Sequence, residues 1–262
     1  MTTHENDILL RADTDGIATL TLNRPSARNA LSTGLMAALQ VEIDAIATDT
    51  AIRVVVIAAN GPAFCAGHDL REVRGTPTRA AYEALFAQCS ALMLSIMRLP
   101  QPVIARVHAT ATAAGCQLVA TCDLAVAAES ACFATPGVNI GLFCSTPMVA
   151  VSRNLGRKQV MEMLLTGEMI DAEAARAGGL INKAVPNDAL DDAVGAYCRQ
   201  IVSKSPLTLK IGKEAFYRQL EMPLEDAYTY ASEVMVTNML ARDAEEGIDA
   251  FLEKRPPEWT GE

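Results

Sequence analysis

Two turns rich in small residues are the parts of this chain best suited to hold a ligand close to the backbone. GPAFCAGHDL, residues 61–70, follows an apolar run typical of a buried strand, and TAAGC, residues 112–116, separates a similar run from an apolar helix. Small residues let a backbone approach a ligand and aim its N–H groups at it. Two such turns can each direct one N–H at the same oxygen, as in an oxyanion hole. Either turn alone indicates an ordinary strand-to-helix connection, whereas the two in this order favour the hole.

A neutral side chain stands beside the second turn, where an acid or a base is usual. Gln117 falls in the first turn of the following helix, between Cys116 and Leu118. An amide can hold a water molecule by hydrogen bonds, but it cannot accept a proton near neutral pH. The sequence therefore predicts a site that could polarise a carbonyl group without an evident proton carrier.

The elements that must position these turns follow from the hydrophobic pattern. Residues 8–25 predict a hairpin around Asp15-Gly16, and residues 31–49 predict a helix with Ser32 as its N-cap. Strands and helices then alternate up to residue 128, which predicts an α/β core with parallel strands. From residue 145 onward the pattern is nearly all helical, apart from a strand in LINKAV, residues 180–185. A composition shift near Ser203 divides the chain into an α/β core, residues 1–202, and a helical region, residues 203–262.

Composition excludes several classes of protein. The formal net charge of −9 argues against a nucleic-acid-binding protein, which needs a clustered basic face. Seven scattered cysteines without a C-x-x-C pair predict reduced thiols and no metal site. The first ten residues show no targeting pattern, and no apolar run reaches membrane-spanning length. We therefore expect a cytoplasmic protein with no membrane partner.

Five segments of the chain carry a family resemblance: NRPSARNAL, GPAFCAGHDLREV, residues 102–142, MLLTGEMIDAEAARAGGLINKAV and EEGIDAFLEKRPPEW. Together they resemble the enoyl-CoA hydratase/isomerase family, the crotonases. This resemblance covers nearly the whole chain and implies the crotonase (ClpP/crotonase) fold, a spiral of ββα units with a C-terminal helical trimerisation region. It also implies an acyl-CoA thioester as ligand, coenzyme A as part of that substrate rather than a separate cofactor, and a homotrimer or hexamer. Two parts, ATAAGCQLVA and FATPGVNIGLFCSTP, are most similar to the subgroup called enoyl-CoA hydratase domain-containing protein 3.

The resemblance assigns the oxyanion hole to the backbone N–H groups of His68 and Ala114. The family usually has glycine at the second of these positions, and alanine is tolerated there if the turn needs no positive φ. The resemblance also assigns residues to the binding of coenzyme A. Arg24, and Lys254 of a neighbouring subunit, would contact its phosphates and adenosine. Ala66, Asp69 and Leu70 would line the binding site at the first small-residue turn.

In hydratases of this family, two glutamates hold the water and pass its proton to the α-carbon; here Gln117 and Gly137 stand in their places. A positioned general acid or base contributes about 10²–10⁴ in rate. Loss of both, with the hole retained, predicts a nominal enoyl-CoA hydratase of fatty acid metabolism, a carbon–oxygen lyase, with weak hydration activity.

Other activities of the same fold remain open. AGHD resembles the methylmalonyl-CoA decarboxylases of the family, in which enolate stabilisation matters more than a base, and His68 could take part through its side chain. Cys144 and Ser145 fall where sister activities place catalytic groups, as a thioesterase would need, although no adjacent base is visible. A catalytically silent acyl-CoA-binding protein is the alternative outside the enzymes.

Overall fold

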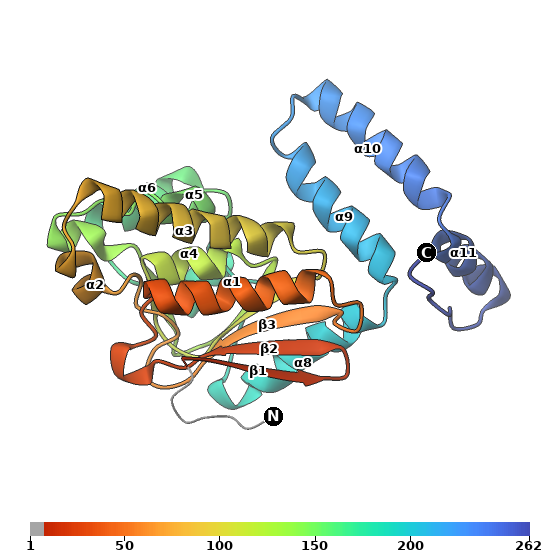
Figure 1. Ribbon diagram of the computed structural model, residues 1–262. Helices are drawn as coiled ribbons and strands as arrows, with labels where there is room; N and C mark the ends of the chain where they lie inside the picture. Colours follow the sequence, from red (N-terminus) through yellow and green to blue (C-terminus); the bar gives the residue numbers. More distant parts are fainter. Residues whose placement is uncertain (1–7) are drawn as a thin grey trace.

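The computed structural model describes residues 8–262, and the first seven residues, on which part of the targeting prediction depends, lie outside this range. Two sheets form the body, and helices cover them (Figure 1). The larger sheet has the strand order β1-β2-β3-β4-β6-β9 and the smaller one the order β5-β7-β8. The strands are β1 Leu9–Thr14, β2 Ile17–Leu22, β3 Val54–Ala59, β4 Val103–Val107, β5 Ala111–Thr112, β6 Leu124–Ala128, β7 Cys132–Ala134, β8 Ile170–Asp171 and β9 Lys183–Val185.

The helices fall into a set around the body and a set of three at the C-terminus. Those of the body are α1 Thr33–Ala47, α2 Leu70–Gly75, α3 Arg79–Arg98, α4 Ala114–Thr121, α5 Pro147–Val151, α6 Arg157–Thr166, α7 Ala172–Gly178 and α8 Leu190–Val202. Those of the C-terminal region are α9 Pro206–Gln219, α10 Leu224–Met239 and α11 Arg242–Glu253.

Local chemistry explains the first elements as predicted. Asp15 and Gly16 both adopt positive φ, at 51° and 78°, which joins β1 to β2 as a tight antiparallel hairpin. Ser32 caps α1, since its side chain accepts a hydrogen bond from Leu35 N at 3.1 Å. Beyond the hairpin the larger sheet is parallel. The predicted α/β core is confirmed.

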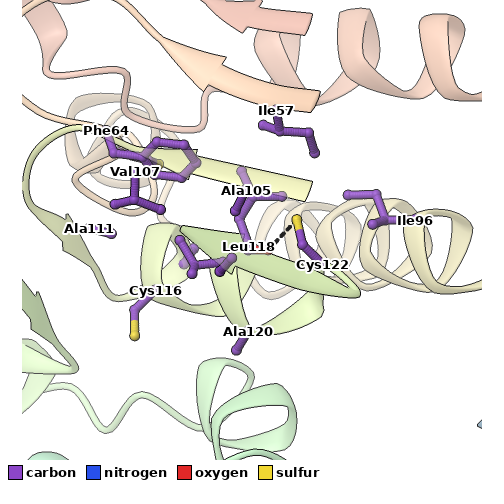
Figure 2. Packing of buried hydrophobic residues seen from close by; sticks show 14 of the residues in the cluster. Ile57, Phe64, Ile96, Ala105, Val107, Ala111, Cys116, Leu118, Ala120 and Cys122 are labelled. Atoms are coloured by element: carbon purple, nitrogen blue, oxygen red, sulfur yellow. Dashed lines mark hydrogen bonds between the residues drawn. The ribbon is translucent and has the colours of Figure 1, made fainter. Parts of the chain in front are cut away.

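Helices pack on both faces of the larger sheet, so its central strand β3 is buried along its whole length. One apolar cluster joins the sheet to α1, α3 and α4, and Figure 2 shows part of it, with Leu118 of α4 and Cys122, the residue after α4, beside Ala105 of β4. A second cluster joins the other face of the sheet to α8 through Leu190 and Val194.

The smaller sheet was not predicted, and it determines where the second turn lies. Consecutive strands alternate between the two sheets. β4 joins the larger sheet and β5 the smaller one, and α4 follows; β6 then joins the larger sheet and β7 the smaller one, before α5. This repetition is the predicted spiral of ββα units. Pairing of β5 with β7 brings Thr112 beside Ala134, so the start of α4 is held next to the smaller sheet.

Among the described residues, α3 is the one helix whose length and hydropathy would suffice to cross a membrane. It packs against α1, and its apolar face lies in the core. The buried residues of this face are Leu85, Cys89, Leu92, Met93 and Ile96. α3 therefore packs as an amphipathic helix, with one apolar face in the core and the opposite face exposed.

The C-terminal helices extend from the body (Figure 1). The predicted boundary at residue 203 falls in the short link between α8 and α9. Lys213 of α9 attaches this region to the body, because its Nζ lies 2.7 Å from the Asp123 carboxylate and donates to the carbonyl of Gln101 at 3.0 Å.

Candidate active site

Leu31 holds the first small-residue turn. Its N–H donates to Gly67 O at 2.7 Å, and its carbonyl accepts from Asp69 N at 3.2 Å, so Leu31 forms a parallel bridge with His68. In a parallel bridge of this kind, Gly67 and Asp69 make the hydrogen bonds to Leu31. The residue between them, His68, directs its own N–H to the opposite side. The N–H of His68 therefore faces away from Leu31 and has no hydrogen-bond acceptor in residues 8–262.

The second turn leaves a matching N–H free. Ala114 is the first residue of α4, so its N–H is one of the amides that the helix itself cannot satisfy, and no other acceptor in the described structure takes its place. The residue of this turn with a positive φ is Ala113, at 50°, one residue before Ala114. Alanine at position 114 is therefore unstrained.

Two glycines bring the turns together. A Cβ on Gly67 would lie 3.4 Å from the Ala114 N and 2.8 Å from the Ala113 Cβ, and Gly67 has a φ of 93°. A Cβ on Gly115 would lie 2.1 Å from the carbonyl oxygen of Cys65. Any side chain at either position would push the turns apart. The structure thus brings together the two segments that carry the free N–H groups.

Gln117 and Thr135 place unpaired polar atoms near the start of α4. Gln117 is 4% exposed, and its Oε1 is buried without a hydrogen-bond partner in the part of the chain that is described. Helical side chains lean toward the N-terminus of their helix, which directs Gln117 toward Ala114. Thr135 is fully buried with an unpaired Oγ1, and it follows Ala134, whose carbonyl accepts from Ala113 N at 2.9 Å. Both groups can hydrogen-bond a ligand or a water molecule.

Gly137 lies in a tightly packed environment. A Cβ there would lie 2.8 Å from the carbonyl oxygen of Leu142 and 3.0 Å from the Cys144 Sγ. The Leu142 N–H donates to Gly137 O at 2.9 Å, which closes the loop over the glycine. The Cys144 thiol thus takes up space that a side chain at position 137 would need, and burial raises its pKa. Ser145 donates to Phe143 O at 3.3 Å rather than to a base.

The His68 ring is half-buried and packs edge-on against Phe86 of α3, with 5.7 Å between ring centroids. Neither ring nitrogen has a hydrogen-bond partner in the described residues. Burial lowers the pKa of His68, so the ring is neutral at pH 7. Phe86 also lies on the solvent-facing side of α3, beside Arg79, Tyr82, Glu83, Ala87 and Ser90.

The residues assigned to coenzyme A lie in two places. Ala66 and Leu70 are exposed beside the first turn, where a ligand could reach them. Arg24 and Asp69 are paired with each other at 2.8 Å, so the predicted phosphate contact of Arg24 would compete with this ion pair. Lys254 is exposed at the end of α11, apart from both turns within one chain (Figure 1).

Sequence reasoning missed Asn29, which joins the segment before α1 to the first turn. Its side chain is fully buried, donates to Asn60 O at 2.7 Å and Ala63 O at 2.8 Å, and accepts from Arg24 N at 2.8 Å. It adopts a φ of 52°, which asparagine tolerates better than most residues. An asparagine in a turn between two apolar segments was the available signal.

Comparison with known proteins identifies the same pattern over the whole chain. The family model described as enoyl-CoA hydratase/isomerase matches residues 12–262. The chain is 46% identical to rat enoyl-CoA hydratase domain-containing protein 3, mitochondrial, over 94% of its length and 82% of that protein. A crystal structure titled enoyl-CoA hydratase from Mycobacterium smegmatis is 55% identical, with a TM-score of 0.95 over 97% of this chain and 99% of that one. The human domain-containing protein 3 has a structure 45% identical, with a TM-score of 0.94 over 97% and 100% of the two chains.

The comparisons confirm the predicted fold and the similarity to the domain-containing protein 3 subgroup. They contradict the predicted cytoplasmic location, because the rat, human and mouse relatives are named mitochondrial. That prediction was wrong because it treated a missing targeting pattern as evidence of location, and a folded core carries no physical mark of its compartment.

Proposed function

The chain belongs to the enoyl-CoA hydratase/isomerase family, and on this premise we propose that it binds an acyl-CoA thioester and polarises its carbonyl between the N–H groups of His68 and Ala114. The observation that carries the proposal is the pair of unsatisfied N–H groups on two turns packed against each other. Such donors stabilise the negative charge that develops on a thioester oxygen when an enolate forms. Coenzyme A enters as part of the substrate.

The proposed reaction is enoyl-CoA hydration of low efficiency. Gln117 can hold a water molecule through its unpaired oxygen, but it cannot move the proton of that water. Gly137 supplies no side chain, and burial raises the pKa of the adjacent Cys144 thiol, which therefore stays protonated near neutral pH and cannot accept a proton. The retained hole and the missing proton carriers together favour slow carbon–oxygen lyase chemistry.

A second candidate follows from the two residues without an acid or base, Gln117 and Gly137, at the places of the family glutamates. Decarboxylation of an acyl-CoA needs the enolate-stabilising N–H groups and no general base, and the neutral His68 ring borders the first turn. Thioester hydrolysis has less support, because Ser145 has no base as partner. If no acyl-CoA is turned over, the remaining proposal is a silent acyl-CoA-binding protein.

We expect acyl-CoA thioesters to bind more tightly than free coenzyme A. The thioester adds two hydrogen bonds from N–H groups that have no acceptor within residues 8–262, whereas free coenzyme A leaves both groups without a carbonyl partner. One net hydrogen bond of about 1 kcal/mol corresponds to roughly a fivefold change in Kd. Calorimetry with butyryl-CoA and free coenzyme A measures the difference, and equal affinities would refute the proposed hole.

We also propose that the chain forms a homotrimer or a dimer of trimers through its C-terminal helices. These helices leave large apolar side chains uncovered within one chain, namely Phe216, Leu220, Leu224, Met235, Val236, Met239, Leu240, Ile248, Phe251 and Leu252. A gathering of large exposed apolar side chains on one set of helices is typical of an interface. Light scattering should give three or six times the mass of 27.9 kDa, and a monomer at working concentration would contradict the proposal.

A further inference from the structure

The Arg24 side chain connects the two chain segments that form the Leu31–His68 bridge, and this bridge orients one N–H group of the proposed hole. Its Nη1 donates to Ala30 O at 2.6 Å, and its Nη2 donates to the Asp69 carboxylate at 2.8 Å. Ala30 precedes Leu31, and Asp69 follows His68, so the guanidinium joins the two segments directly beside the Leu31–His68 bridge. No other side chain in residues 8–262 makes hydrogen bonds to both of these segments at this point.

The backbone of Arg24 is itself held in place by Asn29. The Arg24 N–H donates to the buried side chain of Asn29 at 2.8 Å, and the Arg24 carbonyl accepts from Asn29 N at 2.9 Å. The side chains of Arg24 and Asp69 are 21% and 12% exposed, so water screens their attraction less than it screens a surface pair. Charge-assisted hydrogen bonds in such surroundings hold geometry better than neutral ones.

A phosphate group would bind poorly at this guanidinium. Asp69 already accepts one of its N–H groups, and the hydrogen bond from Arg24 lowers the pKa of Asp69, so the carboxylate is charged at neutral pH. A phosphate brought to Arg24 would therefore meet a like charge, and it would have to displace Asp69 or the Ala30 carbonyl.

We infer that Arg24 is a positioning residue for the proposed reaction: by linking Ala30 to Asp69 it fixes the direction of the His68 N–H, and it is not a ligand of the coenzyme A phosphates. The inference rests on the proposed function, because it assumes that the His68 N–H meets a thioester oxygen. Removal of Arg24 should then affect the bound carbonyl and leave the binding of the nucleotide part unchanged.

The test compares Arg24→Met, Asp69→Asn and the double variant with the wild-type protein. A conjugated dienoyl-CoA reports carbonyl polarisation as a red shift of its absorbance on binding, and free coenzyme A reports the phosphate contacts. We expect each single variant to reduce the red shift to a similar extent, the double variant to add little, and Kd for free coenzyme A to change by less than about twofold. Arg24→Lys should retain part of the shift, because one ammonium cannot reproduce the two-armed contact. Arg176→Met removes the exposed pair of Arg176 with Glu173 and serves as the control that changes neither readout.

The outcomes separate the two proposals. If the wild-type protein binds the dienoyl-CoA without a red shift, the proposed function fails and this inference fails with it. If the wild-type protein shows the shift and Asp69→Asn retains it in full, or if Arg24→Met weakens free coenzyme A about tenfold or more, only the positioning role is refuted. Should Arg24→Met not fold, Asp69→Asn and Arg24→Lys still decide, since both keep a cation at position 24.

Discussion

Replacing Gly115 by alanine is expected to destabilise the fold by about 3 kcal/mol or more and to abolish selective thioester binding. The added Cβ would lie 2.1 Å from the Cys65 carbonyl oxygen and 2.8 Å from the Cys65 Cβ. Backbone cannot move aside as the end of a flexible side chain can, because Cys65 is held on both sides. Its N–H donates to Thr110 O at 3.3 Å, and its carbonyl accepts from Thr112 N at 2.9 Å. The two turns must therefore separate.

Gly75→Ala is the matched control, because no atom lies within 4 Å of the position its Cβ would take, and it should change stability by less than about 0.5 kcal/mol. Urea unfolding measures the stability of both variants, and calorimetry compares butyryl-CoA with free coenzyme A. A Gly115→Ala protein that unfolds at the wild-type midpoint and still prefers the thioester would show that the two turns need not touch.

The body of the fold could be predicted because its signals are local. The Asp15-Gly16 pair requires a two-residue hairpin, and Ser32 begins a helix whose apolar residues recur on one face. The smaller sheet escaped prediction for the same reason: β5 and β8 have two residues each, which is too short for an alternating pattern. These strands exist because neighbours distant in the sequence pair with them.

The candidate site was predictable in its composition but not in its geometry. Small residues indicated both turns, yet the bridge from Leu31 to His68 spans 37 positions and leaves no local pattern. The positive φ of the second turn lies on Ala113, where the residue type argues against it. Resemblance alone identified position 137, and it gave no indication that Leu142 and Cys144 crowd that glycine. Long-range contacts of this kind depend on the whole fold.

Restoring two carboxyl groups is expected to raise hydration of a short enoyl-CoA by about 10²-fold or more. Gln117→Glu places a carboxyl beside the proposed hole, and Gly137→Glu supplies the second. Either change alone should give little, because both groups act on the same water and such effects are not additive. Steady-state hydration of crotonyl-CoA measures the gain.

Gln117→Glu alone should also make stability depend on pH. The new carboxyl is buried at a site that is 4% exposed, so its pKa in the folded protein is raised above the unfolded value of about 4.3. The folded state then holds the proton more tightly than the unfolded state. Stability relative to the wild-type protein should therefore fall as pH rises above about 4.3 and level off above the raised pKa. Urea unfolding at several pH values tests this, and a difference that is constant with pH would show that the carboxyl reaches water.

The crowding at Gly137 decides how the second carboxyl must be supplied. Gly137→Glu places a Cβ 2.8 Å from the Leu142 carbonyl oxygen, so the loop of residues 141–146 has to move. The control is Gly137→Ala with Gln117→Glu, which carries this strain without a carboxylate at position 137.

Cys144→Asp offers a route without a Cβ at position 137, because the Cys144 Sγ already lies 3.0 Å from the place that this Cβ would take. Gln117→Glu with Cys144→Asp should therefore hydrate faster than Gln117→Glu with Cys144→Ser, a neutral variant of similar size. If both carboxyl pairs fold, bind the thioester and hydrate no faster than the wild-type protein, proton transfer is not what limits this site. The N–H groups of His68 and Ala114 would then serve decarboxylation or binding alone.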